Sequence, residues 1–199
     1  MSSSYETLGS TGTAAGAGAG GTTAATKSLR TLYYSRFGFA VVWAVLTMAI
    51  AKTINPAAAV LLVIYPLFDV AAAVIDFRTA GSARPKSTLY VNMALSLLAT
   101  VGLAVAAASG IPAVLRVWGA WAITAGIVQL VVAIQRYRLG GQWPMTLSGG
   151  ISVLAGGSFV LMAGKPDPSL TSIAGYAILG GIFFLSSAIR LHRLAGKAN

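Results

Sequence analysis

The chain has 199 residues, of which 56% are hydrophobic and 9% are charged, and it carries a net charge of +10. Soluble domains usually contain about a quarter charged residues, so this composition excludes an ordinary soluble protein and indicates that lipid surrounds most of the chain. The sequence contains no cysteine, which excludes disulfide bonds, thiolate metal sites and cysteine nucleophiles. Because the lysines and arginines fall between apolar runs, as topology signals do, we expect no nucleic-acid partner.

The first 29 residues have the composition of a polar tail. Residues 1–26 contain one charge, Glu6, and are rich in Gly, Ala, Ser and Thr, as disordered segments are. They lack the basic start and the apolar core of a signal peptide. Gly16, Gly18 and Gly21 have the spacing of a dinucleotide-binding loop, but no strand precedes them, so we expect no such site. We predict a disordered cytoplasmic tail over 1–29 and a membrane domain over 30–199.

Six apolar runs follow, each close to the length of about 20 residues that a helix needs to cross a bilayer. They cover 36–53, 56–77, 88–109, 112–135, 145–163 and 169–190. We therefore predict an all-α fold, a six-helix transmembrane bundle whose partner is the lipid bilayer.

Basic residues are distributed unevenly about these runs. Three of them, Lys52, Arg116 and Lys165, fall on one side. The other eleven fall on the side of the chain termini: Lys27, Arg30, Arg36, Arg78, Arg84, Lys86, Arg136, Arg138, Arg190, Arg193 and Lys197. This positive-inside bias predicts that both termini are cytoplasmic.

The chain contains an internal repeat. Pro56, Pro112 and Pro168 recur at intervals of 56 residues, and proline suits the first turn of a helix because its missing N–H would be unpaired there. Each hairpin then ends in an arginine followed three residues later by a glycine, a helix C-cap pattern. These pairs are Arg78 with Gly81, Arg138 with Gly141, and Arg193 with Gly196. We predict three repeated helical hairpins over about 30–84, 85–141 and 142–196.

With these hairpins, their prolines, the Gly126-Ile127 and Gly181-Ile182 steps and the arginine-rich ends, the chain resembles the HdeD-like acid-resistance family of bacterial integral membrane proteins. The resemblance covers about residues 30–195. It implies a six-helix protein of the bacterial inner membrane that is linked to acid stress, with no established chemistry and no catalytic residues. The first hairpin departs from the pattern, because Pro66 stands where the other copies have Gly126 and Gly181.

The stretch YPLFDVAAAVIDFR, residues 65–78, carries two of the four acidic residues, Asp69 and Asp76. Asp69 precedes Arg78 by nine residues, about 13 Å along a helix, which places it in the inner half of the hydrocarbon core. A carboxylate at the bilayer centre costs about 2.5–3.5 kcal/mol, so the position requires compensation.

Several features could offset the free-energy cost of placing the Asp69 carboxylate in the hydrocarbon core. Pro66 is expected to kink the helix, which would put Asp69 near exposed N–H groups in the first turn of the lower half. Arg36, Gln129 and Asn92 are candidate side-chain partners in the same leaflet. Alternatively, the carboxyl group is protonated. Two roles stay open: a satisfied carboxyl group at a helix contact, or a group that senses or relays protons.

Asp76 lies two turns beyond Asp69 on the same helix face. We expect it to be an interfacial charge that reaches water or pairs with a basic residue of the rim, namely Arg78, Arg84 or Arg136.

Small residues recur at four-residue spacing in the third hairpin, which is typical of close helix packing in membranes. The ladder comprises Ser148, Ser152 and Gly156 in its first helix and Ala177 and Gly181 in its second. We predict close packing within that hairpin, with a homo-oligomer interface as the alternative.

The sequence shows no constellation of catalytic residues and no cofactor motif. Its only histidine, His192, has no partners at metal-ligand spacing. The sequence therefore predicts a non-enzymatic membrane protein of the acid-stress type without metal or cofactor. The alternative is a small proton-coupled transporter or channel that uses Asp69, with Gln129 and Asn92 lining the path.

Overall fold

The computed structural model describes residues 12–79, 86–135, 137–139 and 142–196, and over these ranges the chain is helical. The α-helices are α1 (Gly12–Ile50), α2 (Pro56–Thr79), α3 (Lys86–Ala107), α4 (Ile111–Gln135), α5 (Trp143–Met162) and α6 (Thr171–Gly196), and a 3₁₀ turn, η1 (Tyr137–Leu139), follows α4. Each α-helix contains a stretch of 20 to 25 residues that is long and apolar enough to cross a membrane. The predicted all-α fold with six spans is confirmed, and the chain is a multi-pass membrane protein.

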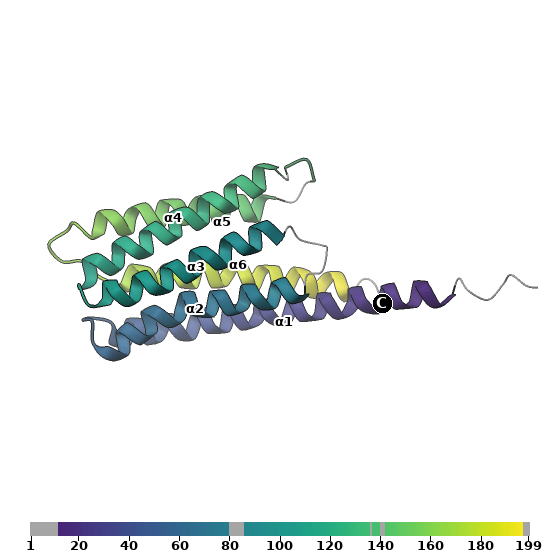
Figure 1. The fold of residues 1–199 in the computed structure, drawn as a ribbon, viewed down its shortest axis with the longest axis horizontal. Helices are drawn as coiled ribbons and strands as arrows, with labels where there is room; N and C mark the ends of the chain where they lie inside the picture. Colours follow the sequence, from purple (N-terminus) through teal and green to yellow (C-terminus); the bar gives the residue numbers. More distant parts are fainter. Residues whose placement is uncertain (1–11, 80–85, 136, 140–141, 197–199) are drawn as a thin grey trace, which may run out of the picture.

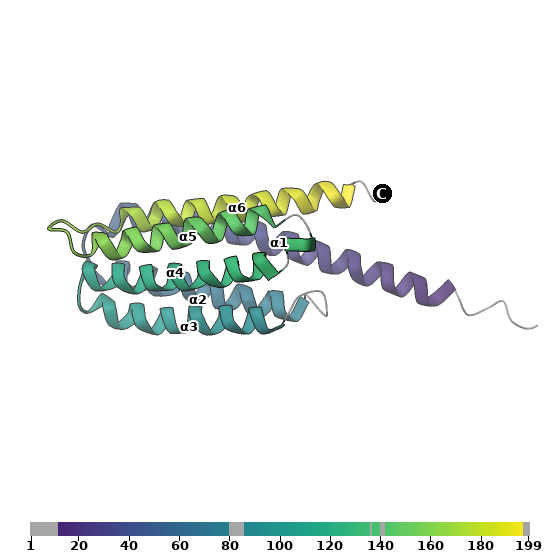
Figure 2. The ribbon, with the colours of Figure 1, turned by 90° about the horizontal axis from the view of Figure 1, so that it is seen from above.

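The six helices run antiparallel along one axis (Figure 1). The α1–α2, α3–α4 and α5–α6 connections lie at one end of the bundle, which we call the loop end. The start of α1, the end of α6 and the α2–α3 and α4–α5 connections lie at the other, which we call the termini end. The N-terminal part of α1 extends beyond the termini end in both views (Figures 1 and 2). The predicted tail over 1–29 falls partly on residues 1–11, outside the described residues, and the span of α1 starts at Lys27.

Consecutive helices are neighbours, and α1 lies beside α6, so the six helices close into a ring. The most extensive contacts join α4 to α5, α1 to α6 and α2 to α3, whereas the two helices of the third hairpin touch only slightly. The helices therefore pair mainly across the boundaries of the predicted hairpins. The threefold repeat itself stays a prediction.

Local chemistry sets the helix starts at the loop end. The side chain of Asn55 caps α2 by accepting a hydrogen bond from the N–H of Ala58 at 2.9 Å. Before α4, Gly110 has a φ of 96°, a conformation that suits glycine, and Pro112 occupies the first turn. Pro168 was predicted to lie in the first turn of a helix, but it precedes α6, which begins at Thr171.

The loop-end half of the bundle holds an aromatic core. The ring centroids of Trp43 and Trp118 lie 5.3 Å apart, and Tyr65 lies 5.4 Å from Trp118. Trp43 also donates from Nε1 to the carbonyl of Leu61 at 2.6 Å, which satisfies a buried indole and ties α1 to α2. The polar residues described below lie on the same helices, nearer the termini end.

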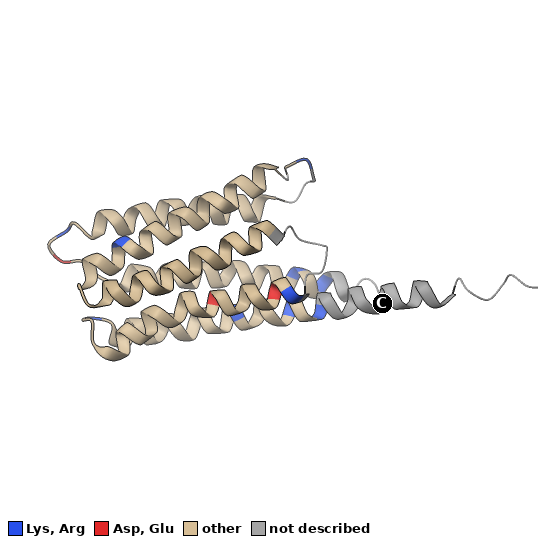
Figure 3. Ribbon diagram, in the orientation of Figure 1, with Lys and Arg blue, Asp and Glu red and all other residues tan. Residues whose placement is uncertain are grey.

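Charge is concentrated at the termini end. Figure 3 shows Lys and Arg gathered there on α1, α2 and α6. The described residues of this cluster are Lys27 and Arg30 on α1, Arg78 on α2, and Arg190 and Arg193 on α6. This arrangement matches the basic rim that the sequence predicts for one membrane face.

Candidate functional site

The candidate site is a polar cluster centred on Asp69 of α2. The helix continues through Pro66 from Pro56 to Thr79, and Pro66 itself is fully buried. Compensation for the carboxylate comes from side chains on α1 and α3. Arg36 of α1 donates from Nη2 to Asp69 Oδ1 and forms an ion pair with it.

Two residues of α3 bind the second carboxylate oxygen. Asn92 Nδ2 donates to Asp69 Oδ2 at 2.9 Å, and Ser96 Oγ donates to the same oxygen at 2.7 Å. They lie four residues apart, so one face of α3 presents both donors. The carboxylate thus accepts hydrogen bonds from three side chains on two helices. Such a set satisfies a buried anion through charge-assisted bonds.

The guanidinium of Arg36 has a further neighbour on α6. Its Cζ atom lies 4.2 Å from the ring centroid of Phe184, a cation–π contact. Through Arg36 and Asp69, the cluster joins four helices, namely α1, α2, α3 and α6.

The ion pair is largely shielded. The side chains of Arg36 and Asp69 are each 14% exposed. A partly buried pair of this kind adds little to stability relative to apolar residues, but removal of one partner leaves an uncompensated charge that costs about 3–5 kcal/mol. The cluster therefore constrains the arrangement of α1, α2 and α3 more than it strengthens the bundle.

Of the partners that the sequence suggested for Asp69, the structure brings together Arg36 and Asn92. Gln129 lies on α4, and its Oε1 atom is buried with no hydrogen-bond partner among the described residues. Ser96 and Phe184 are the members that the sequence did not single out. Ser96 carries a usable signal, since it follows Asn92 by one helical turn.

The side chain of Asp76 is more buried than we expected. Its side chain is buried on α2, with 4% exposed, so it is not the solvated interfacial charge that its position near the helix end suggested. Arg78 is exposed. The suggested pairing with Arg84 or Arg136 falls outside the described residues.

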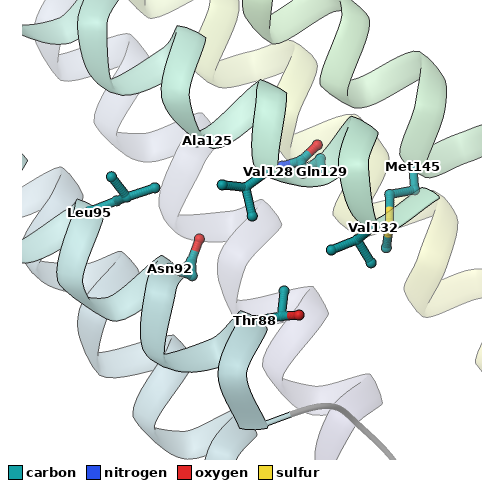
Figure 4. A pocket seen from close by; sticks show the side chains of 8 residues that line it. All are labelled: Thr88, Asn92, Leu95, Ala125, Val128, Gln129, Val132 and Met145. Carbon is teal, nitrogen blue, oxygen red and sulfur yellow. The ribbon is translucent and has the colours of Figure 1, made fainter. Parts of the chain in front are cut away.

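A cavity of about 70 Å³ adjoins the cluster between α3, α4 and α5 (Figure 4). It occupies the termini end of these helices, because Thr88 is in the first turn of α3 and Met145 is in the first turn of α5. Its lining consists of Thr88, Asn92 and Leu95 from α3, Ala125, Val128, Gln129 and Val132 from α4, and Met145 from α5. Asn92 belongs both to this lining and to the Asp69 cluster.

The small residues of α5 pack against α4. A Cβ atom on Gly156 would lie 2.6 Å from the carbonyl oxygen of Gly119, and one on Gly126 would lie 2.7 Å from that of Gly149. Backbones approach this closely only where side chains are absent. On α6, Ala177 is buried, and a Cβ atom on Gly181 would lie 3.2 Å from the Cβ of Ala40 on α1.

The predicted close packing within the third hairpin is therefore wrong in its choice of partners, which are α4 for α5 and α1 for α6. The helices α5 and α6 still touch at a few side chains. Tyr176 of α6 donates from its hydroxyl to Ser152 Oγ of α5 at 2.8 Å. Ser152 in turn donates to the carbonyl of Ser148 at 2.9 Å, within α5.

Over the described residues, no group of three or more His, Asp or Glu side chains lies close enough together to hold a metal ion. His192 lies at the termini end, with its Nδ1 atom 3.3 Å from Nη1 of Arg30.

Comparisons of the chain with protein-family models, with curated proteins and with solved structures find no match. The resemblance to the HdeD-like family therefore stays a prediction.

Proposed function

We propose that this multi-pass membrane protein is non-enzymatic, resides in the bacterial inner membrane with both termini in the cytoplasm, and responds to acid through the Arg36–Asp69 pair. The observation that carries the proposal is that Asp69, a carboxylate within the span of α2, binds an arginine of α1 and two donors of α3. Acid-stress function of the kind found in the HdeD-like family is the role that fits this arrangement.

The physical argument concerns what protonation does to the cluster. A protonated Asp69 loses its attraction to the guanidinium and retains only part of its capacity to accept hydrogen bonds. The shielded positive charge of Arg36 then loses the negative charge of Asp69 beside it, which is unfavourable in a bilayer. The contact of α1 with α2 and α3 at this level weakens as a consequence. Acidification of the adjoining compartment is thereby converted into a change in helix packing.

The proposal is tested by acid survival of cells that express the Asp69→Asn variant, which keeps the shape of the side chain and removes its charge. The variant holds the cluster in the packing of the protonated state, so we expect it no longer to switch on acidification and to lose any protection that depends on the switch. Survival is compared at matched protein levels, because loss of the Asp69 charge lowers stability. Asp167→Asn is the matched control, because Asp167 is exposed in the α5–α6 connection. Equal survival with the wild-type protein and with Asp69→Asn would overturn the acid-responsive role.

A proton-coupled transporter or channel is the second candidate, and the cavity beside Asn92 favours it. In that case Asp69 exchanges protons during transport, and Gln129 and Asn92 line the path. Flux measured in liposomes with the purified protein separates the two functions. Proton or solute flux that disappears in Asp69→Asn supports transport, whereas no flux above that of empty liposomes supports the non-transporting role.

A further inference from the structure

The cavity between α3, α4 and α5 has a polar wall that faces the Asp69 cluster. Asn92 lines the cavity from α3 and also donates to Asp69 Oδ2 at 2.9 Å. Gln129 lines it from α4, on the opposite side (Figure 4). The cavity therefore ends one side chain away from the carboxylate.

Gln129 has unsatisfied hydrogen-bonding capacity at this position. Its Oε1 atom is buried and has no hydrogen-bond partner among the described residues. A buried amide oxygen without a donor costs about 1–3 kcal/mol, so native structures usually supply one, either from protein or from water. In this conformation Oε1 has almost no accessible surface, so a water in the cavity reaches it only after the Gln129 side chain rotates. The amide of Asn92 and the hydroxyl of Thr88 offer such a water two partners, within the two to four it requires.

The volume decides which class of ligand fits. A cavity of about 70 Å³ is far smaller than the pockets of roughly 300–1,000 Å³ that hold drug-sized ligands. It exceeds the roughly 10–15 Å³ that one water molecule requires. Small, neutral, hydrogen-bonding molecules of the size of water are therefore its ligands.

We infer that this cavity is a water-binding site that connects the termini end of the bundle to Asp69 through Asn92. The route begins beside Thr88 in the first turn of α3 and reaches Asn92 one turn deeper. Water in it carries protons as far as Asn92, one side chain from the carboxylate, without crossing the hydrocarbon, and displacement of the Asn92 amide by water completes the transfer to Asp69. This inference extends the proposed acid response by giving protons a route to Asp69. The role of the water site as a proton route rests on the proposed function, whereas the presence of water in the cavity does not.

The natural absence of cysteine makes the inference directly testable. Single cysteines at Gln129 and at Leu95, which both line the cavity, are introduced into the full chain in lipid nanodiscs. Each is treated with a small charged methanethiosulfonate reagent, which reacts with thiolates in water and not in hydrocarbon. Ala133→Cys, buried one turn from Gln129, and Val131→Cys, on the outer face of the same helix, are the controls.

We expect Gln129→Cys and Leu95→Cys to react at least about tenfold faster than both controls, because only they meet water. Adding Ala125→Leu, which fills the cavity, should reduce the rate at Gln129→Cys to that of the controls. Cavity positions that react no faster than Ala133→Cys and Val131→Cys would overturn the inference. Reactive cavity positions together with unchanged acid survival in Asp69→Asn would refute the proposed function and leave the water site standing.

Discussion

Arg36 and Asp69 lie 33 positions apart in sequence and form an ion pair inside the membrane domain, between α1 and α2. The same guanidinium lies over the ring of Phe184 on α6, and the same carboxylate binds Asn92 and Ser96 on α3. Each charge therefore has an electrostatic partner and a second contact on another helix. We therefore expect the bundle to tolerate the two charges together or the absence of both, but not one charge alone.

Removal of one charge should be more harmful than removal of both. We predict that Asp69→Ala lowers the free energy of unfolding by about 3–5 kcal/mol, because Arg36 loses the negative charge with which it forms its ion pair. The double variant Arg36→Met with Asp69→Leu should recover most of this loss, since apolar side chains suit the hydrocarbon. Reversible unfolding in mixed micelles measures both. Equal losses in the double variant and in the single one would contradict the pairing.

Ser96 contributes a hydrogen bond to the charged oxygen from a fully buried position. We predict that Ser96→Ala lowers the free energy of unfolding by about 1–2 kcal/mol, because the carboxylate loses a donor at a fully buried position. Ser187→Ala is the matched control, since among the residues that the structure describes the hydroxyl of Ser187 binds the carbonyl of Phe183 in its own helix and no carboxylate. It should change stability by less than about 0.5 kcal/mol. Indistinguishable unfolding of the two variants would argue against the contact with Asp69.

Glycines of α5 that look alike in sequence should differ in their tolerance of a methyl group. A Cβ atom on Gly156 would lie 2.6 Å from the carbonyl oxygen of Gly119, whereas one on Gly157 would meet nothing within 4 Å. We predict that Gly156→Ala destabilises the protein by about 1–3 kcal/mol, because α4 and α5 must separate. Gly157→Ala should leave stability unchanged or raise it by up to about 1 kcal/mol through helix propensity. Thermal unfolding in detergent compares them, and the reverse order would refute the α4–α5 contact.

The orientation of the chain is testable at its ends. We predict that a cysteine added at either terminus reacts with a membrane-impermeant reagent only after the cells are opened, because the basic rim keeps both ends in the cytoplasm. A cysteine at Ser169, which is exposed at the loop end, should react in intact spheroplasts. Labelling of a terminus in intact cells would contradict the predicted cytoplasmic location of the chain ends.

The six spans and the partners of Asp69 were predictable for the same physical reason. Uncharged runs of about 20 residues have no stable place in water, and a charge within such a run requires a counter-charge at the same depth. Arg36 is the basic residue closest to that depth, so it could be named from the sequence. Ser96 was harder to name: it follows Asn92 by one helical turn, but serine is common in membrane helices and its partners depend on helix rotation.

The choice of neighbours for α5 and α6 was not predictable from their small residues. A ladder such as Ser152 and Gly156 shows that another backbone comes close, but it does not identify the partner helix. Pairing within the predicted hairpin made α6 the expected partner of α5. Gly119 and Gly126 of α4, which lack side chains, instead let the backbones of α4 and α5 come close together. The burial of Asp76 was likewise missed, because distance from a helix end does not reveal which neighbours cover a side chain.

Protonation of Asp69 beside Arg36 on acidification can be observed by infrared difference spectroscopy of the protein in lipid. On acidification, the wild-type spectrum should gain a carbonyl band of a protonated carboxyl group and lose a carboxylate band. Because other carboxyl groups also contribute to these bands, we expect the contribution of one carboxyl group to be missing in Asp69→Asn, and the band missing in Asp167→Asn to be a different one. A wild-type spectrum and an Asp69→Asn spectrum with the same acid-induced bands would contradict the protonation of Asp69.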